Sequence, residues 1–302
     1  MGPPGALRVC VLVGKGAPSF MRLKIFAPAK VNLHLQVLGR RPDGYHELAT
    51  LMQPLSLGDE LTIDDQAEEL IFTCDDPELL EDNLAEKAAR LWFQAAERPP
   101  RAALHLSKKV PVAAGLGGGS SDAAAALIGL NAIHGSLLPP GRLVELALSL
   151  GADVPFFLAG ATGWCTGIGE KVELWPDFPL LNYVLVNPGF PVSTAQIYAE
   201  WDLAWTNPSV VNTIYRPPKA ASDLDGLLRN DLEFATQKAF PQVEDLQRAL
   251  REAGAMGALM SGSGPTVFGV FPNAGAAAKA AERLASQQDW WVRACRGYMD
   301  RP

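Results

Sequence analysis

The feature that most constrains this chain is a glycine-rich stretch that runs directly into an alanine-rich segment. Residues 108–135 read KKVPVAAGLGGGSSDAAAALIGLNAIHG. Glycine lets the backbone take positive φ angles and approach a ligand closely, because no Cβ atom stands in the way. Alanine has the highest helix propensity, so the second part of the stretch predicts a helix. Its N-cap candidates are Ser120, Ser121 and Asp122, and His134–Gly135 should end it.

A glycine loop that leads into a helix N-terminus predicts an anion-binding site. The first backbone N–H groups of a helix lack partners within it and carry the positive end of the helix dipole. A polyphosphate is the anion we expect. The Walker A motif is excluded because Ser120 follows Gly119 where that motif needs lysine, and nothing after Gly135 fits a dinucleotide fingerprint. A linker or a tight strand-to-helix turn is the alternative, but linkers do not usually end in helix signals.

The composition is that of a globular protein with an acidic balance. The 302 residues are enough for two domains, and 48% of them are apolar while 20% are charged. The net charge of −7 argues against nucleic-acid binding through a broad basic face. A polyphosphate must therefore be held by local positive side chains, and those near candidate motifs are Lys30, Arg40, Arg41, Lys108, Lys109 and Lys171.

The cysteines and the N-terminal residues indicate where in the cell the protein is expected to be. The four cysteines are isolated from one another and form no cluster with histidine, so we expect reduced thiols in a cytoplasmic protein. No apolar run has the length of a membrane span. The apolar patch at residues 9–13 is broken by Gly14 and Lys15, which makes a signal peptide the weaker interpretation. Residues 1–20 are predicted to be a disordered extension, with the folded part beginning at Met21.

Two candidate catalytic side chains lie where the local pattern also permits a purely structural role. Residues 21–38 alternate as a strand, and Pro28 should divide them into two halves. Lys30 opens the second half, where it could be an ordinary solvated lysine. Asp153 follows a helix end and precedes Pro155, so the chain there should be extended. Aspartate at such a place is most often a turn or cap residue.

The second half of the chain alternates strands and helices, which indicates a ferredoxin-like α+β layer. We place the domain boundary just before Asp177. Residues 201–222 are polar and contain proline, so we expect a long surface excursion. Asn230 and Glu233 have the spacing of a capping box and should open a helix.

Several motifs occur together in one order: APAKVNL, RRPDGYHEL, PVAAGLGGGSSDAA, GADVPFF, GIGEK, NDLE and MSGSGPTVF. This order resembles the GHMP kinase superfamily, which includes galactose, homoserine and mevalonate kinases. The combination of APAKVNL, DGYH and GADVPFF resembles the subfamily that phosphorylates the 2-hydroxyl of 4-diphosphocytidyl-2-C-methyl-D-erythritol in non-mevalonate isoprenoid biosynthesis. The resemblance covers the chain from about Met21 onward. It implies an α+β fold with an N-terminal mixed α/β domain (21–176) and a C-terminal ferredoxin-like α+β domain (177–302).

The resemblance also implies residue roles. The ATP loop falls on Pro111, Val112, Ala113, Ala114, Gly115, Leu116, Gly117, Gly118, Gly119, Ser120 and Ser121. The catalytic pair falls on Lys30 and Asp153. The aspartate would accept the proton of the substrate hydroxyl, and the lysine would keep the aspartate ionised and offset phosphoryl charge. Contacts to the cytidine diphosphate group fall on Asn32, Tyr45, His46, Thr194 and Tyr198.

Within this set, Tyr45 and Tyr198 are expected to stack on the cytosine, and His46 to bond to its edge. ATP is the expected cosubstrate, and Mg²⁺ should be carried by its phosphates, with metal ligands unassigned. The expected partner is a small molecule, with no nucleic acid or membrane, and the oligomeric state is left unassigned.

Three alternatives remain open at this point. Another small-molecule GHMP kinase would share the glycine loop and MSGSG, but would not be expected to carry DGYH with Tyr198. An inactive superfamily member could act as a sensor, although the presence of Lys30 and Asp153 counts against it. A nucleic-acid-binding module would need a basic face, which the acidic balance does not supply.

Overall fold

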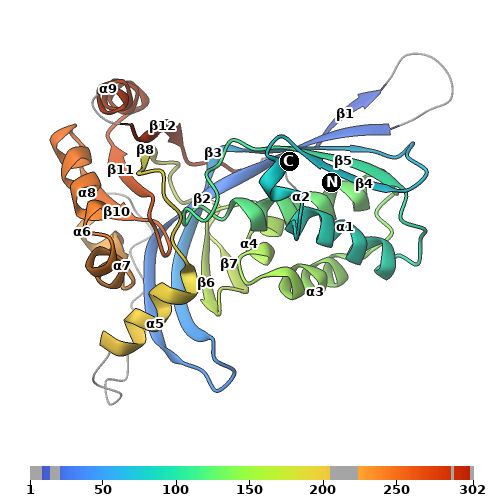
Figure 1. The fold of residues 1–302 in the computed structure, drawn as a ribbon, viewed down its shortest axis with the longest axis horizontal. Coiled ribbons are helices and arrows are strands. Elements are labelled where there is room, and N and C mark those ends of the chain that lie inside the picture. The colour runs from blue at the N-terminus through green and yellow to red at the C-terminus, as the bar shows by residue number, and fades with distance from the viewer. Residues whose placement is uncertain (1–8, 14–20, 205–223, 287–288, 300–302) are drawn as a thin grey trace.

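The computed structural model describes residues 9–13, 21–204, 224–286 and 289–299. They form two lobes, each built on its own β-sheet, at the right and left of Figure 1. The right-hand sheet is organised around two long antiparallel strands, β2 (Met21–Arg40) and β3 (His46–Asp64). A turn at residues 42–44 joins them, and β2 runs through the middle of the molecule in Figure 1.

The other strands of this sheet lie on both sides of the β2–β3 pair. Strand β5 (Ala102–Ser107) pairs with the second part of β3, and β4 (Leu70–Cys74) lies outside it. Strand β6 (Gly163–Gly167) pairs with the first part of β3 and forms an antiparallel hairpin with β7 (Lys171–Leu174).

Residues 21–40 form one strand, and the prediction of two halves divided at Pro28 is wrong. The pairing with β3 shifts register between Pro28 and Lys30, so the strand passes the proline with a bulge. Gly58 lies opposite Pro28, and a Cβ atom at residue 58 would clash with the Ala27 carbonyl oxygen. The missing side chain therefore lets the two backbones approach, and the strand continues to Lys30.

The prediction for the first 20 residues needs one correction. Residues 9–13 form strand β1 (Val9–Val13), which pairs antiparallel with Met21–Ile25. The segment VCVLV is rich in β-branched valine, which favours a strand wherever a free edge such as that of β2 is available. Residues 1–8 and 14–20 of the predicted extension lie outside the described residues.

Four helices cover one face of the right-hand sheet (Figure 1): α1 (Leu84–Ala95), α2 (Gly118–Ile133), α3 (Pro140–Leu150) and α4 (Val154–Ala159). Helix α1 begins after Asn83, whose side chain caps it by accepting a hydrogen bond from the Ala85 N–H at 2.9 Å. Helix α2 lies directly on the sheet at Gly129, where a Cβ atom would come within 2.7 Å of Ile25 and 2.6 Å of Ile63.

The left-hand lobe has the predicted ferredoxin-like α+β character. Its sheet is antiparallel, in the order β10 (Gly257–Met260), β11 (Val267–Phe271), β8 (Asn182–Asn187) and β12 (Trp291–Arg296). Helices α8 (Gln242–Glu252) and α9 (Ala274–Ala285) pack on it, and their buried residues join those of the strands in one apolar core.

The remaining described elements of this half are α5 (Thr194–Ala204), α6 (Leu224–Leu227), β9 (Arg229–Asn230) and α7 (Glu233–Ala239). Strand β9 pairs in parallel with β2, so this half of the chain also contributes to the first sheet. The predicted excursion at 201–222 begins inside helix α5, and residues 205–222 lie outside the described residues.

The buried side-chain amide of Gln53 is one of the groups that join the two lobes. Gln53, in β3, donates to the Thr162 hydroxyl at 2.9 Å and to the Pro179 carbonyl at 3.0 Å. Its oxygen accepts from the Leu181 N–H at 3.3 Å and from the Tyr183 hydroxyl at 2.7 Å. The segment that carries the predicted boundary at 176/177 is therefore fastened to the first sheet. The boundary itself stays a prediction.

Among the described residues, no helix combines the length and the apolar character that crossing a lipid bilayer requires. The three cysteines whose side chains are described, Cys74, Cys165 and Cys295, are free thiols.

Candidate active site

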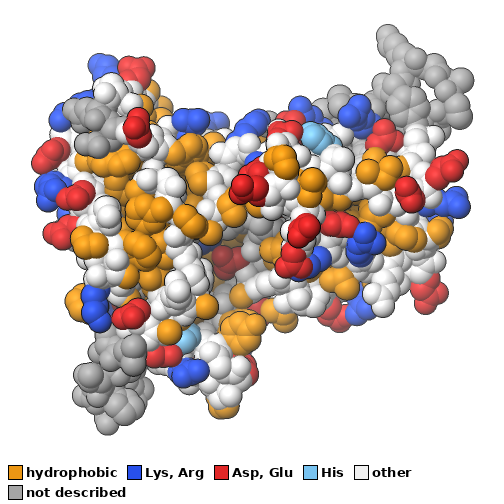
Figure 2. Space-filling model, in the orientation of Figure 1, with side chains coloured by type: hydrophobic (Ala, Val, Ile, Leu, Met, Phe, Trp, Pro, Cys, Tyr) orange, Lys and Arg blue, Asp and Glu red, His pale blue; other side chains and the backbone are white. Residues whose placement is uncertain are grey.

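A cleft of about 960 Å³ lies between the lobes, where Figure 2 shows the molecule hollowed. It is lined by β2, the start of β3, the glycine loop, the residues before α4, helix α5 and the turn after β10. All predicted site residues line it except one. Ser121 is buried inside helix α2, so its side chain faces the core instead of the cleft.

The glycine loop leads into helix α2 earlier than predicted. The helix starts at Gly118, and its N-cap residue is Gly117 with a left-handed φ of 70°. The prediction of Ser120, Ser121 or Asp122 as N-cap is therefore wrong. Glycine takes the left-handed conformation without strain, and this lets the helix begin inside the glycine run. The free N–H groups of the first turn consequently lie in the loop itself, as an anion site requires.

The carbonyl groups of residues 113–116, in the middle of the loop, are all occupied by protein donors. Ala113 accepts from the Val192 N–H at 3.3 Å, Ala114 from the Thr266 N–H at 3.4 Å and Leu116 from the Lys30 N–H at 2.9 Å. The Gly115 carbonyl accepts twice, from Lys30 Nζ at 3.1 Å and from Ser261 Oγ at 2.9 Å. With its acceptors engaged by both lobes, the loop is held in place and keeps N–H groups for a ligand.

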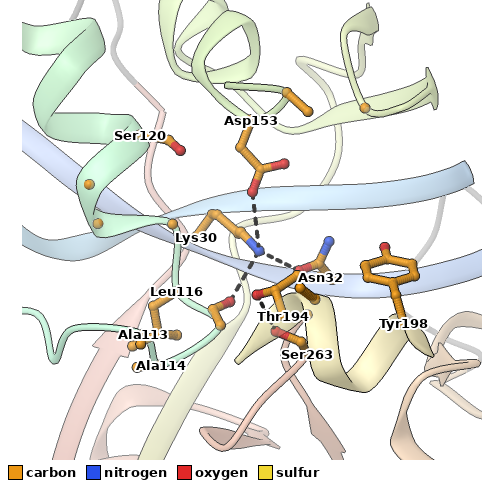
Figure 3. A pocket seen from close by; sticks show the side chains of 18 of the residues that line it. Lys30, Asn32, Ala113, Ala114, Leu116, Ser120, Asp153, Thr194, Tyr198 and Ser263 are labelled. Carbon is orange, nitrogen blue, oxygen red and sulfur yellow. Dashed lines mark hydrogen bonds and ion pairs between the residues drawn. The ribbon is translucent and has the colours of Figure 1, made fainter. Parts of the chain in front are cut away.

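Lys30 is the central cation of the cleft (Figure 3). Its side chain is 5% exposed, and Nζ lies 2.6 Å from Asn32 Oδ1 and 3.7 Å from Asp153 Oδ2. Burial lowers the pKa of Lys30 from its ordinary value, and the Asp153 carboxylate opposes part of that shift. A solvated strand lysine, the alternative interpretation, would not be buried among oxygen atoms in this way.

Asp153 occupies the N-cap position of α4 without acting as a cap. Its backbone is helical, with φ −82° and ψ −14°, so the prediction of an extended chain before Pro155 is wrong. Proline at the second helical position needs no N–H partner, which lets the helix start directly after Asp153. Within the described residues its carboxylate caps no N–H group of α4. It turns toward Lys30 and is 36% exposed to the cleft.

A second ion cluster, formed by Lys108, Asp59 and Asp122, holds the residues at which the loop begins. Lys108 Nζ lies 2.5 Å from Asp59 Oδ2 and 2.7 Å from Asp122 Oδ2, and both carboxylates are buried. Asp59 Oδ1 also accepts from the N–H groups of Lys109 and Val110, where the loop begins. Burial raises the pKa of Asp122 to about 7, against the pull of the Lys108 ammonium. The cluster fixes the entry of the loop, and neither aspartate was among the predicted site residues.

The MSGSG turn closes the site from the second lobe. Ser261 Oγ accepts from the Asn32 N–H at 3.2 Å while it donates to the Gly115 carbonyl. A helix opens at Glu233 as predicted, and the Asn230 side-chain oxygen accepts from the Leu232 N–H at 2.9 Å. The reciprocal capping box itself is not formed, because both side chains also hold the MSGSG turn. Asn230 Nδ2 donates to the Met260 carbonyl and to the Gly262 carbonyl, each at 2.8 Å. The Glu233 carboxylate accepts from the Met260 N–H at 2.9 Å. Helix α7 is left with Leu232 as its N-cap.

The other end of the cleft is aromatic and more open. Tyr45 is 59% exposed at the tip of the β2–β3 hairpin. His46 is buried and stacks on Tyr198, with 4.6 Å between the ring centroids. The Thr194 hydroxyl lies 2.8 Å from the Ser263 hydroxyl. In Figure 3 Tyr198 lies beyond Asn32, on the side away from Asp153, so the aromatic and ionic ends are separate.

This arrangement suits phosphoryl transfer to a hydroxyl group. The loop and the helix N-terminus offer N–H groups to a polyphosphate, and Lys30 supplies positive charge beside them. The partly exposed Asp153 carboxylate can accept a proton. The tyrosines at the far end offer flat surfaces to a base.

Four side chains of the site escaped prediction: Asp59, Asp122, Ser261 and Thr50. Asp59 and Ser261 meet the loop only through tertiary contacts 49 to 51 and 146 positions away. Thr50 supports Asn32, whose Nδ2 donates to the Thr50 hydroxyl at 2.9 Å. The pairing of β2 with β3 would have indicated Thr50, because it lies on the strand opposite Asn32.

Comparison with known proteins gives consistent matches. The family model described as GHMP kinases N terminal domain matches residues 83–161, and GHMP kinases C terminal matches residues 218–289. A protein of Geobacter metallireducens named 4-diphosphocytidyl-2-C-methyl-D-erythritol kinase is 44% identical over 283 residues, covering 91% of this chain and 98% of that protein. A protein of the same name from Syntrophus aciditrophicus is 43% identical over 276 residues, with coverages of 90% and 98%.

Solved structures agree with these matches. A crystal structure of 4-(cytidine 5'-diphospho)-2C-methyl-D-erythritol kinase matches with a TM-score of 0.78 and 36% identity, covering 91% of this chain and 99% of that chain. Homoserine kinase from Cytophaga hutchinsonii matches with a TM-score of 0.67 and 19% identity, with coverages of 95% and 97%. The second likeness concerns the fold alone.

Proposed function

The chain belongs to the 4-diphosphocytidyl-2-C-methyl-D-erythritol kinases of the GHMP kinase superfamily, and we propose that the cleft is its active site. The reaction transfers a phosphoryl group from ATP to the 2-hydroxyl of 4-diphosphocytidyl-2-C-methyl-D-erythritol. The observation that carries the assignment of the site is the Lys30–Asp153 pair, at 3.7 Å beside the glycine loop.

The glycine loop, Pro111–Ser121, is proposed to hold the ATP phosphates. Its carbonyls at residues 113–116 are engaged by the protein, so an anion would meet N–H groups of the loop and of the first turn of α2. Lys30 can offset charge that spreads over the transferring phosphoryl oxygens. Because Ser121 is buried, its contribution to this site would come from its backbone.

Asp153 is proposed to orient the 2-hydroxyl and to accept its proton. Phosphoryl transfer has a loose transition state, so a carboxylate need take the proton only late in the reaction. The bond from the hydroxyl oxygen to phosphorus forms as the bond to the ADP oxygen breaks, and the proton passes to Asp153. Lys30 Nζ faces the same carboxylate at 3.7 Å.

Mg²⁺ is proposed to enter with ATP. Asp153 and the Ser120 hydroxyl bear oxygen ligands of the kind that Mg²⁺ prefers, and both side chains line the cleft beside the loop. Among the described residues, no group of three or more His, Cys, Asp or Glu side chains could hold a metal ion. A metal that keeps phosphate and water ligands needs no such group. When bound, it would neutralise phosphate charge.

The cytidine diphosphate group is proposed to lie at the aromatic end. Tyr45 and Tyr198 provide ring faces for the cytosine. His46 directly follows Tyr45 in the chain, and its ring stacks on that of Tyr198. Asn32 and Thr194 lie between this end and Lys30, as a substrate that spans the cleft requires (Figure 3).

The test is a substrate comparison with the full-length chain. ATP and Mg²⁺ are supplied with 4-diphosphocytidyl-2-C-methyl-D-erythritol, mevalonate or homoserine, and phosphorus NMR follows ADP and the phosphorylated product. We expect turnover with the cytidine compound only. Turnover of another alcohol in preference would contradict the substrate, and ATP binding without turnover would indicate a binding protein.

A further inference from the structure

The ring of His46 is held on three sides. Tyr198 stacks on its face at 4.6 Å, and Trp201 meets it edge-on at 5.7 Å. On the third side, Nε2 lies 2.7 Å from Asp202 Oδ1, a residue of helix α5 with no role in the site so far. The ring lines the cleft. Within the described part of the chain, Nδ1 makes no hydrogen bond, and it is not sealed from solvent. The Nδ1 edge is thus the one left for a ligand.

Asp202 dictates which nitrogen of His46 carries the hydrogen. Its second oxygen, Oδ2, lies 3.7 Å from Arg40 Nη1. An ionised carboxylate only accepts hydrogen bonds, so Nε2 must be the donor. A neutral imidazole has a single N–H group, and the partner of one nitrogen therefore sets the character of the other. Nδ1 is left as the acceptor of a ring that lines the cleft.

We propose that Asp202 is a positioning residue that makes the site specific for cytosine. With Nε2–H held by Asp202, the Nδ1 lone pair can accept from the exocyclic amino group of cytosine. Uracil carries a carbonyl oxygen at the same place, and two acceptors would face each other. A site built to pair a polar group rejects an analogue that leaves the group unpaired. The inference rests on the proposed function, because it assumes that the base of the substrate meets His46.

Asp202 could alternatively serve only to hold α5 against the β2–β3 hairpin. That role predicts a loss of stability, or a rise in KM, that is the same for both bases. The tautomer hypothesis predicts a change in the ratio of the two bases. The ratio therefore separates the two roles, because a purely structural change would leave it constant.

The kinetic experiment compares kcat/KM for the cytidine diphosphate substrate with that of its uridine analogue. Three full-length chains are used: wild type, Asp202→Asn and Glu200→Gln. Glu200 lies on the same helix and pairs with Lys238 at 3.4 Å, so its variant removes the same charge without touching His46. We expect the cytidine preference to fall at least about tenfold in Asp202→Asn, because the asparagine amide can donate to Nε2 and move the ring hydrogen to Nδ1. Glu200→Gln should keep the wild-type ratio.

A second measurement does not depend on turnover. Nitrogen NMR of labelled histidine in the wild-type chain reports which ring nitrogen is protonated, and His46→Gln identifies the signal. We expect the Nε2–H form for His46. An Nδ1–H form, or a base preference unchanged in Asp202→Asn, would overturn the proposal. If wild type phosphorylates neither pyrimidine substrate, the proposed function fails, and the NMR result still decides the tautomer.

Discussion

The two ends of the cleft are built in different ways. At the ionic end, the proposed phosphate end, Lys30 is buried and contacts Asn32, Gly115 and Asp153, and the loop carbonyls are bonded to both lobes. At the aromatic end, the proposed base end, Tyr45 is 59% exposed, and the described part of helix α5 ends at Ala204. One end is fixed by many buried polar contacts, whereas the other depends on a few aromatic faces and one histidine.

This difference separates chemistry from selection. Transfer of a phosphoryl group needs atoms held to a fraction of an ångström, and buried, multiply bonded groups provide that precision. Recognition of a base tolerates an open site, since stacking is permissive and a single edge contact can discriminate. Changes at the phosphate end should therefore affect kcat, and changes at the base end should affect KM for one substrate.

The strongest test of the phosphate end is Asp153→Asn. The amide keeps the shape but cannot accept the hydroxyl proton, so we expect kcat to fall by about 10²–10⁴-fold while ATP still binds. Steady-state kinetics and calorimetric ATP titration measure the two quantities. Asp177→Asn, at an exposed position, is the control and should behave as wild type. If the variant kept most of the wild-type kcat, Asp153 would be a turn residue without a catalytic role.

The second test perturbs the loop without touching a charge. A Cβ atom at Gly115 would clash with the Ser261 carbonyl oxygen, and the φ of 76° is unfavourable for alanine. In Gly115→Ala the loop must shift, and the carbonyl that Lys30 contacts shifts with it, so we expect kcat to fall by roughly 10²-fold. Gly141→Ala, in open space on α3, should leave the rate unchanged. Equal rates for the two variants would show that the loop is not held as described.

Tyr198→Ala tests the base end. Stacking on an aromatic ring is worth about 1–3 kcal/mol per base, so KM for the cytidine substrate should rise roughly ten- to a hundredfold. KM for ATP should change little, because the loop is bonded elsewhere. Tyr198→Phe keeps the ring and serves as the control. A similar rise in both KM values would mean that Tyr198 supports the fold, and the two ends would not be independent.

The smallest effect concerns stability alone. Burial raises the pKa of Asp122 to about 7, well above the ordinary value of about 3.9. The folded chain holds this proton more tightly than the unfolded one, so the contribution to stability is present below about pH 4 and is lost as pH rises through about 7. Asp122→Asn cannot titrate. We therefore expect the melting temperature of Asp122→Asn, relative to that of wild type, to rise as the pH is raised from 5 to 8. A constant difference would contradict the shift.

Local patterns predicted the parts of the site that are contiguous in sequence. The glycine run marked the loop that leads into α2. The family resemblance added Lys30 and Asp153, which alone looked like ordinary strand and turn residues. The structure brings them within 3.7 Å of each other although 123 positions separate them, a distance that no local pattern encodes.

The errors have a common physical cause, which is that tertiary contacts compete with local preferences. Asn230 and Glu233 have capping spacing, but the carbonyls and the N–H group of the MSGSG turn offer them other partners. Pro28 should end a strand, but a bulge opposite Gly58 accommodates it. In each case the competing partner lies in a segment far along the chain, so a local interpretation could not weigh it.

The shared acceptor at Gly115 has a consequence for how the enzyme is made. Its carbonyl joins Lys30, 85 positions earlier, to Ser261, 146 positions later. A ribosome adds about 5–20 residues per second, so roughly ten to fifty seconds pass between the synthesis of the lysine and that of the serine. During this interval the first sheet can form, but the loop lacks one of the donors that fix it. The nascent chain therefore completes the set of donors around the Gly115 carbonyl only after residue 261 has emerged.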